Sequence, residues 1–445
     1  MSLRMAKNPT GGVSPQHDME RHSLDPVSVQ YVVKRDNILK AWKQVRANKG
    51  AAGVDNISIE EFPVYAHENW KGIKKSLLEG EYKPSPVKRV DIPKDSGGTR
   101  ELGIPTVMDR VIQQAITQVL TPVFDPHFSE SSFGFRPERS AHQAVKKVLK
   151  DIHKGYRYAV DIDLEKFFDT VDHNVLMNRV SRHIRDKGIP RLIGKYLRAG
   201  VVVNGSLNLT GKGVPQGGPL SPMLSNILLD DLDKELEKRG HRFARYADDL
   251  TILVKSKRAG ERVMESISRF LKRKLKVKVN RDKSKVVKAE ESVFLGFAFT
   301  RKRLNVSEKS LTRFKSEVRR LTGRSWGVSM QYRYAALHIY IQGWMNYFGI
   351  GMRYNYAVEL DHWLRRRIRM CYLKQWRRAR RRIGELIRLG SPKYQAILTG
   401  LSRKGYWHLA KTLSTNCGLS NGYLEKQGLV SIRSLWIGIH YPAKT

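Results

Sequence analysis

The segment from Phe243 to Val254 constrains the fold of this 445-residue chain more than any other. Two apolar runs flank the tripeptide Ala247-Asp248-Asp249. Strand-forming runs on either side of a short polar tip predict a β-hairpin that carries two adjacent carboxylates at its turn. Because Asp is common at turns, a pair of surface acids is the simplest alternative.

A second set of acids lies at the end of another predicted strand, Tyr156–Asp163. Its residues alternate so that Asp161 and Asp163 fall on one face. A helix is expected to begin near Asp172, a suitable N-cap. Carboxylates that lie close together repel one another unless a cation neutralises them. Oxygen ligands of this kind suit Mg²⁺, and two such ions form a clamp for in-line phosphoryl displacement.

The net charge points to an anionic partner. The chain has 82 Lys+Arg and 42 Asp+Glu, a formal charge of +40. Residues 301–445 hold 29 basic and 6 acidic residues, a net of +23, and ten basic residues without an acid run from Arg365 to Arg382. Aromatic residues adjoin this run, which favours RNA or single strands over a membrane surface. No stretch of 18 apolar residues and no secretory signal is present.

Cysteine usage excludes two classes of small domain. Cys371 and Cys417 are the only cysteines, and they form no C-x-x-C pair or zinc-type cluster. A disulfide framework is therefore excluded, and a reducing compartment is the expected setting.

Three further segments have features of a nucleotide site. In Arg89–Pro105, Gly97-Gly98 predict a hairpin turn with Lys94 and Arg100 on either side, where two cations could clamp a triphosphate or simply be exposed. In Gly211–Leu232, glycines allow close approach of the backbone, and Ser221-Pro222 predict the start of a helix. The third segment, Ser131–Val145, is a loop with the sequence FGFRP ahead of a helix. An apolar helix stripe from Val111 to Leu120 is expected to end at Pro122.

The order of these motifs resembles the reverse transcriptase of a bacterial group II intron. The matching blocks are IPK-x3-G-x-R, GFRP, DIDLEKFFD, VPQGGPLSP, RYADD and FLGF, and the resemblance runs from about residue 35 to about residue 440. Leu39–Asp55 resembles the extra N-terminal block of non-retroviral enzymes. Ser325–Phe348 is similar to the thumb, or maturase, region, which separates an intron-type enzyme from a retroviral one.

The resemblance implies roles for individual residues. Asp163, Asp248 and Asp249 match the catalytic, metal-binding acids, with Asp161 the less favoured choice on its strand, and the Leu164 carbonyl should help to hold an ion. Phe168 should lie under the sugar and exclude a 2′-hydroxyl. The other expected nucleotide contacts are Lys94 and Arg100 for the triphosphate and Gln216 for the nucleotide and template pocket. Secondary candidates are Arg136, Gly217 and, near the leaving phosphate, Lys283.

The implied fold is α+β, a right-hand polymerase. We expect a flexible extension over residues 1–34, fingers and a palm with an antiparallel sheet over 35–305, a helical thumb or maturase domain over 306–390, and a basic DNA-binding region over 391–445. Many family members carry a C-terminal endonuclease with C-x-x-C pairs. This sequence contains no such pairs, so second-strand cleavage is expected to be absent.

The implied function is RNA-directed DNA polymerisation from a primer 3′-OH with two Mg²⁺ ions, for which Mn²⁺ can substitute. The expected partners are an RNA template, a DNA or RNA primer, dNTPs, group II intron RNA and target DNA, without a membrane, in the bacterial cytoplasm at the nucleoid. One alternative is a stand-alone reverse transcriptase recruited by the host for DNA repair or phage defence. Another is an RNA-binding splicing factor without polymerase activity.

Overall fold

The computed structural model describes residues 27–93, 98–203, 205–209 and 211–442. Most of the predicted N-terminal extension and Lys94 of the predicted triphosphate pair lie outside the described residues. The chain forms two compact units that interleave along the sequence. The first contains residues 1–123, 180–211 and 215–220, and the second contains residues 124–179, 212–214 and 221–445.

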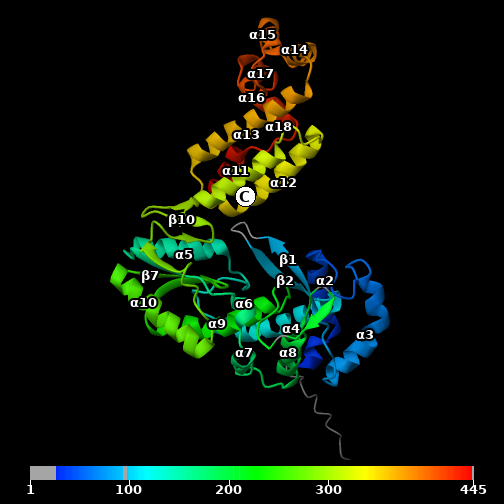
Figure 1. The fold of residues 1–445 in the computed structure, drawn as a ribbon, viewed down its shortest axis with the longest axis vertical. Helices are drawn as coiled ribbons and strands as arrows, with labels where there is room; N and C mark the ends of the chain where they lie inside the picture. Colours follow the sequence, from blue (N-terminus) through cyan, green and yellow to red (C-terminus); the bar gives the residue numbers. More distant parts are fainter. Residues whose placement is uncertain (1–26, 94–97, 204, 210, 443–445) are drawn as a thin grey trace, which may run out of the picture. The chain divides into compact units, whose positions relative to one another are not determined.

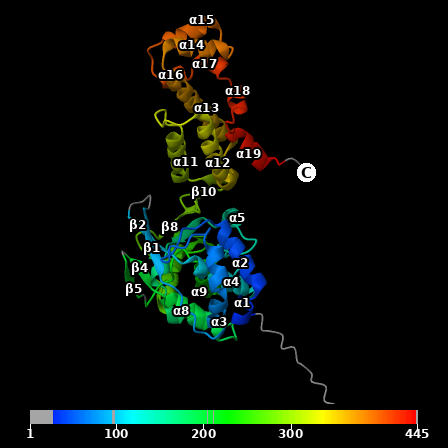
Figure 2. The ribbon, with the colours of Figure 1, turned by 90° about the vertical axis from the view of Figure 1, so that its right-hand side faces the viewer.

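The first unit contains a four-stranded sheet in the order β2-β1-β4-β5 (Figures 1 and 2). Strands β1 (Val87–Pro93) and β2 (Thr99–Ile104) pair antiparallel, with Ile92 opposite Arg100, which confirms the predicted hairpin. Strand β4 (Val201–Val203) runs parallel to β1 and antiparallel to β5 (Ser206–Asn208).

The helices of the first unit build its core around the predicted apolar stripe. They are α1 (Val29–Val32), α2 (Arg35–Ala47), α3 (Phe62–Leu78), α4 (Val107–Phe124) and α8 (Gly188–Arg198). The stripe of α4 from Val111 to Leu120 is buried. However, α4 continues to Phe124 and contains Pro122. The prediction that Pro122 ends the helix is wrong by two residues, because in a last turn the missing N–H removes a single helical hydrogen bond.

A four-stranded antiparallel sheet, in the order β6-β7-β3-β8, forms the centre of the second unit. Its strands are β3 (Tyr158–Ile162), β6 (Arg242–Tyr246), β7 (Asp249–Val254) and β8 (Lys285–Lys288). Helices α5 (Ala141–His153) and α10 (Lys257–Phe270) cover opposite faces (Figure 1). Ala159 packs in the cluster with α5, whereas the adjacent Val160 lies beneath Gly260 of α10. The period of two in β3 therefore gives the sheet two buried faces.

Short elements and one long helix complete this region. Two short helices follow β3, α6 (Phe167–Thr170) and α7 (His173–Val180). The Val175 N–H donates to the Asp172 side chain over 3.0 Å, which confirms the predicted cap. Helix α9 (Ser221–Lys238) begins at Ser221 itself, one residue earlier than an N-cap there would place it. The remaining elements are η1 (Asp125–His127) and a π-helix, η2 (Leu271–Leu275).

The rest of the second unit is a small sheet followed by helices. Strands β9 (Val293–Phe294), β10 (Phe297–Phe299) and β11 (Leu304–Val306) pair antiparallel. Helices α11 (Glu308–Leu321), α12 (Met330–Phe348) and α13 (Tyr354–Gln375) share one apolar core, and Figure 2 shows α11 beside α12. The later elements are η3 (Gly349–Gly351), α14 (Ala379–Arg388), α15 (Lys393–Leu401), α16 (Tyr406–Leu409), α17 (Leu413–Gly418), α18 (Asn421–Lys426) and α19 (Ile432–His440).

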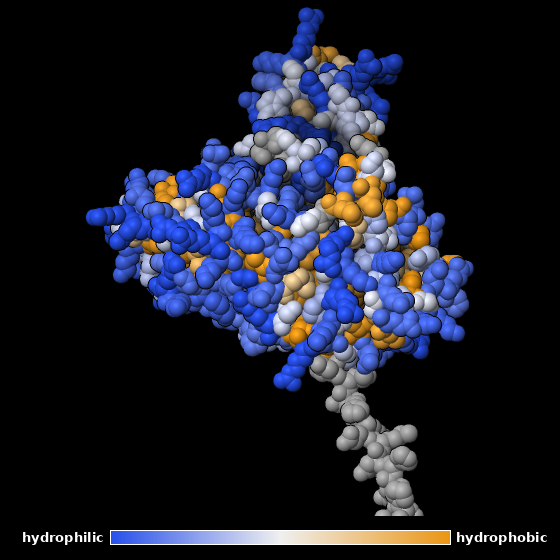
Figure 3. Space-filling view, turned by 60° about the horizontal axis from the view of Figure 1, so that its bottom comes forward, coloured by the Kyte–Doolittle hydropathy of each residue, from blue (hydrophilic) through white to orange (hydrophobic). Residues whose placement is uncertain are grey.

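The predicted α+β class is confirmed, with an antiparallel sheet followed by a helical, arginine-rich region. Hydrophilic residues predominate on the face drawn in Figure 3, consistent with the high charge of the chain. Across the described ranges, no helix is both long and apolar enough to cross a bilayer.

Candidate active site

The strand register brings the two acidic segments together. In the antiparallel pair β3–β7, Ile162 lies opposite Leu250. Asp163 directly follows Ile162 and Asp249 directly precedes Leu250, so the two acids stand opposite each other at the end of the ladder. Opposed residues in such ladders have Cα atoms about 4.5–5.5 Å apart. The expected convergence of these segments is therefore present in the fold.

The acidic tip is a tight two-residue turn. Tyr246 pairs with Asp249, which leaves Ala247 and Asp248 as the turn residues. Ala247 is buried and has a φ of 56°, a left-handed conformation that strains a residue with a side chain. The surrounding contacts must stabilise this conformation, so the direction of the Asp248 backbone depends on them.

Electrostatics distinguish Asp161, which lies in β3, from Asp163, which directly follows the strand. Burial raises the pKa of Asp163, the Lys283 ammonium lowers it, and the charge of Asp248 raises it again, leaving it above its usual value. Burial also raises the pKa of Asp161, but its oxygens accept hydrogen bonds from the Thr251 and Ser292 hydroxyls over 2.8–3.0 Å. Asp161 is thus occupied within the protein, whereas Asp163 interacts with the turn.

The backbone beside Asp163 also offers an oxygen. Asn280 and Ser284 donate to the Asp163 carbonyl, and Glu165 N–H donates to Lys278. Among the described residues, no protein donor bonds to the Leu164 carbonyl. That carbonyl can accept a bond from outside the chain.

These oxygens fit a hard divalent cation chemically, although the side chains alone do not form a closed cage. Within the described ranges, no group of three or more His, Cys, Asp or Glu side chains is positioned to hold a metal ion. Mg²⁺ commonly binds one or two carboxylates and completes its shell with water and substrate phosphates. The donor set of Asp163, Asp248, Asp249 and the Leu164 carbonyl is consistent with such an ion.

Phe168 follows Asp163 by five residues and lies on a braced segment, α6. Its ring is half-buried and packs edge-to-face against Phe167, with centroids 5.2 Å apart. Val214 N–H donates to the Phe168 carbonyl over 2.6 Å. Gly213 has a φ of 94°, and a Cβ there would lie 3.0 Å from the Asp169 carbonyl. The loop 212–214 therefore packs directly on the backbone that carries Phe168.

The other nucleotide candidates lie in the first unit. Arg100 is exposed on β2. Gly103 N–H donates to the Gln216 carbonyl over 2.7 Å, which holds the VPQGG loop against β2. Gly217 has a φ of 122°, and a Cβ on it would lie 2.5 Å from the Gly103 oxygen. This close approach to the Gly103 backbone requires glycine at position 217, whereas the expected approach of these glycines to a substrate stays a prediction.

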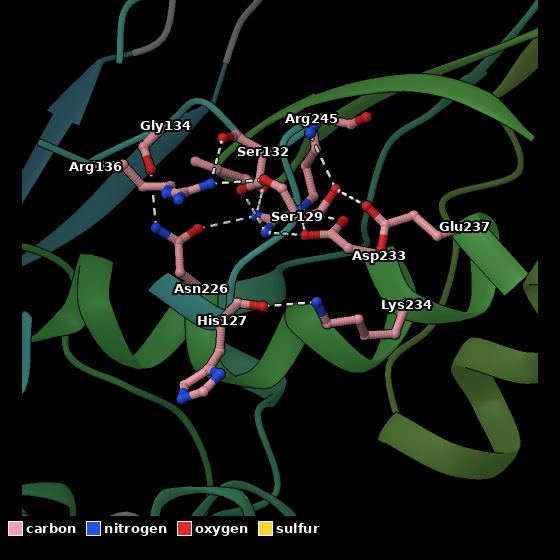
Figure 4. Close-up of polar contacts among 12 residues, drawn as sticks. His127, Ser129, Ser132, Gly134, Arg136, Asn226, Asp233, Lys234, Glu237 and Arg245 are labelled. Carbon is pink, nitrogen blue, oxygen red and sulfur yellow. Dashed lines mark hydrogen bonds and ion pairs between the residues drawn. The ribbon is translucent and has the colours of Figure 1, made fainter. Parts of the chain in front are cut away.

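The structure also reveals a buried polar cluster that the sequence analysis missed (Figure 4). Arg245 is fully buried, and its guanidinium forms a salt bridge with the fully buried Asp233 of α9. It also donates to the Ala247 carbonyl over 2.9 Å and to Asn226 and Ser132 over 3.0 and 2.8 Å. Arg245 thus ties the acidic turn to α9. An arginine that directly follows the apolar pair Phe243-Ala244 and precedes the acidic turn was the signal that could have indicated this role.

The FGFRP loop packs against the same turn. Phe133 N–H donates to the Arg245 carbonyl over 2.9 Å, and Asn226 donates to the Gly134 carbonyl over 2.8 Å. Arg136 is buried, forms an ion pair with Asp125 over 2.7 Å and donates to the carbonyls of the same loop. These contacts support a structural role for Arg136. Its role as a substrate contact stays a prediction, as does that of the exposed Lys283.

Comparison with known proteins identifies the family. Residues 92–299 match the reverse transcriptase (RNA-dependent DNA polymerase) family, and residues 311–389 match the group II intron maturase-specific domain. Protein YkfC of Escherichia coli is 32% identical over 63% of this chain and 84% of YkfC. The chain belongs to the group II intron reverse transcriptases.

Other members of the family are longer. The group II intron-encoded protein LtrA of Lactococcus lactis is 30% identical over 63% of this chain and 58% of its own length. The putative COX1/OXI3 intron 2 protein of Saccharomyces cerevisiae is 31% identical over 58% of this chain and 37% of its own length. A solved Cas6-RT-Cas1–Cas2 complex aligns with 55% of this chain and 42% of its own chain, at 24% identity and a TM-score of 0.36.

Family membership confirms several expectations from the sequence. The chain has the reverse transcriptase and maturase domains in the predicted order, and its enzyme class is RNA-directed DNA polymerase. Reverse transcriptases depend on divalent metal, and the maturase domain implies intron RNA and other nucleic acids as partners. The predicted domain boundaries and the roles of individual site residues stay predictions.

Proposed function

We propose that this protein copies RNA into DNA at the acidic turn, extending a primer 3′-OH by attack on the α-phosphate of a dNTP. The observation that carries the proposal is the β3–β7 register, which sets Asp163 opposite Asp249 and beside Asp248. Three acids from distant parts of the chain concentrate negative charge at the end of one sheet. Such an arrangement is unfavourable unless it binds cations.

Asp163, Asp248, Asp249 and the Leu164 carbonyl would hold two Mg²⁺ ions, for which Mn²⁺ can substitute. When bound, such ions activate the attacking oxygen and neutralise charge on the departing pyrophosphate. The surrounding residues of the chain hold these metal-binding groups in place. Asp163 sits at a strand end fixed by Asn280 and Ser284, and the turn with Asp248 is fixed by Arg245. Phosphoryl transfer depends mainly on such positioning and on electrostatic stabilisation.

Other residues would select and hold the nucleotide. We assign Phe168 to exclude a 2′-hydroxyl, Arg100 and Lys94 to hold the triphosphate, and Gln216 to line the nucleotide and template pocket. Lys283, whose charge acts on Asp163, would stabilise the leaving phosphate. Arg100 suits this role because an exposed guanidinium can bind phosphate oxygens in a bidentate manner.

We further propose that the protein binds intron RNA to assist splicing and target DNA to support mobility, in the bacterial cytoplasm at the nucleoid. The match to the maturase domain and the net charge of +23 over residues 301–445 support this role. Contacts to phosphates make such binding strongly dependent on salt concentration.

Primer extension on an RNA template, with and without Mg²⁺, tests the polymerase function. We expect DNA synthesis that depends on the ion and is lost in Asp248→Asn, while that variant still binds RNA. RNA binding by wild-type protein without any synthesis would instead favour a splicing factor that lacks polymerase activity.

Phe168→Ala tests nucleotide selection separately. Removing the ring should admit rNTPs into the product, because the steric barrier beneath the sugar is lost. Tyr394→Ala removes an exposed aromatic residue on α15 and is the control that should leave selection unchanged. Equal discrimination by Phe168→Ala and wild-type protein would refute the assignment.

A further inference from the structure

A cationic cavity lies between α13 and the helices that follow it. Its volume is about 500 Å³, and its lining includes His362, Arg365, Arg366, Arg369, Lys411 and Asn421. The first four follow one another at the spacing that places residues on one face of a helix. No acidic side chain is among the described residues that line the cavity.

Two of these arginines are buried, but only one of them, Arg365, forms a hydrogen bond with a carboxylate among the described residues. Arg365 and Arg369 expose 9% and 7% of their surface. Arg365 donates to Asp361 over 2.7 Å. Asp361 also accepts bonds from the Ile432 N–H and the Ser431 hydroxyl over 2.9 and 3.1 Å. Its negative charge is therefore already shared among three donors.

Arg369 has neutral partners. It donates to the Leu419 carbonyl over 2.9 Å and to the Asn421 side-chain oxygen over 3.0 Å. Burial, followed by repulsion from Arg365, lowers the pKa of Arg369 to about 10. A buried cation without a paired anion destabilises the fold. An anion from outside the chain would relieve this cost.

The rim of the cavity presents a further oriented cation. The Arg366 guanidinium lies 3.8 Å from the centre of the Trp407 ring and donates to the Trp407 carbonyl over 2.9 and 3.2 Å. Desolvation lowers the pKa of His408, and the charges of Lys404, Lys411 and Arg366 lower it further. The local field is therefore positive, and Arg366 is held in place before any ligand arrives.

We propose that this cavity is a binding site for a backbone phosphate of a nucleic-acid strand, contacted by Arg366, Arg369 and Lys411. Guanidinium groups match the geometry of phosphate oxygens, and Asn421 contributes a neutral polar group beside them. The proposal rests on nucleic-acid binding by the proposed function, but not on the acidic turn of the second unit.

The test compares the salt dependence of oligonucleotide binding in variants that each remove one positive charge. Arg369→Gln and Lys411→Gln change the cavity. Arg388→Gln is the matched control, because Arg388 is exposed on α14 and pairs with Glu385 over 2.7 Å. Fluorescence anisotropy with labelled single-stranded RNA, an RNA–DNA hybrid and duplex DNA gives log K against log salt for each variant.

Each cavity variant should reduce the slope by about 0.7 to 0.9 and weaken binding in at least one arm, because one phosphate contact is lost. Arg388→Gln should keep the wild-type slope. The oligonucleotide whose salt slope falls in the cavity variants identifies the kind of strand that binds in the cavity. Slopes equal to that of Arg388→Gln in every arm would overturn the proposal.

Two controls separate folding and polymerase defects from the loss of this site. Thermal melting shows whether Arg369→Gln folds, and if it does not, the exposed Lys411 carries the test alone. Asp248→Asn should abolish synthesis but keep the wild-type salt slope. The salt-dependence test of the cavity therefore remains valid even if the proposed polymerase site is wrong.

Discussion

Gly134 is the position where a single methyl group should disable the proposed active site. A Cβ at Gly134 would lie 2.3 Å from the Ala247 nitrogen and 3.0 Å from the Tyr246 carbonyl carbon, both of them backbone atoms. Ordinary contact for such atoms begins at 3.4 Å, so the turn must move by 3.4 − 2.3, or 1.1 Å. The turn cannot move freely, because Arg245 holds the Ala247 carbonyl and the loop is bonded to β6.

A misplacement of about 1 Å at a catalytic group can reduce the rate about 100-fold. Such a loss corresponds to about 2.7 kcal/mol in the activation free energy. We therefore expect Gly134→Ala to lower the single-turnover rate of primer extension by about 100-fold, with the affinity for primer–template unchanged. Overpacking should also lower the free energy of unfolding by about 1–3 kcal/mol.

Gly72→Ala is the matched control for this substitution. Gly72 lies on α3, and a Cβ there would meet nothing within 4 Å. In a helix, Ala is more stable than Gly by about 0.5–1 kcal/mol, so this variant should keep full activity and melt slightly higher. A Gly134→Ala enzyme with the wild-type rate would refute the claim that this loop fixes the turn.

Three other predictions follow from the same geometry. Arg245→Met should reduce the free energy of unfolding in urea by about 3–5 kcal/mol, because Asp233 is left buried without its partner. Adding Asp233→Leu should restore most of that stability but not the polymerase rate, since the Ala247 carbonyl still lacks its donor; full recovery of the rate would contradict this role. Burial raises the pKa of Asp230 from its ordinary value of 3.8 to about 6, so the folded protein should lose stability as pH rises through this range. Thermal melting from about pH 4 to 7 should show that loss in wild-type protein but not in Asp230→Asn, and identical profiles for the two proteins would contradict the prediction. Chelation of divalent ions should stop synthesis while RNA binding, measured by filter retention, persists; continued synthesis in chelator would exclude metal dependence.

Local patterns were sufficient to predict the elements that carry the acids. The apolar runs around Asp248 and Asp249 specified a hairpin, and period two placed Asp161 and Asp163 on one face of β3. Local patterns alone do not determine which strands pair. The prediction that the two segments lie together came from the family resemblance, which rests on the order of the motifs. Strand β3 pairs with β7 across 90 residues of sequence, as Asp161 and Thr251 illustrate.

The features that sequence could not provide depend on long-range packing. Asp161 and Asp163 have the same residue type and the same parity. The family resemblance favoured Asp163, but only the structure shows the physical difference, which is that Asp161 accepts hydrogen bonds from Thr251 and Ser292. Arg245 reads as a surface residue of a hairpin until Asp233 of α9 is placed beside it. The sequence also did not show that Arg136 donates to the Ser129 and Ser132 carbonyls and so braces the loop before it.

Iron-mediated cleavage of the protein backbone tests the central claim most directly. In the presence of hydrogen peroxide and ascorbate, Fe²⁺ bound at the acidic turn in place of Mg²⁺ would reduce the peroxide to hydroxide and a hydroxyl radical, and that radical would cut only the chain nearby. We expect scission near both Asp163 and Asp248 in one sample, suppressed by excess Mg²⁺ and absent in Asp163→Asn, with Asp282→Asn as an exposed control. Scission at one segment alone, or a pattern unchanged in Asp163→Asn, would contradict a cation site shared by these segments.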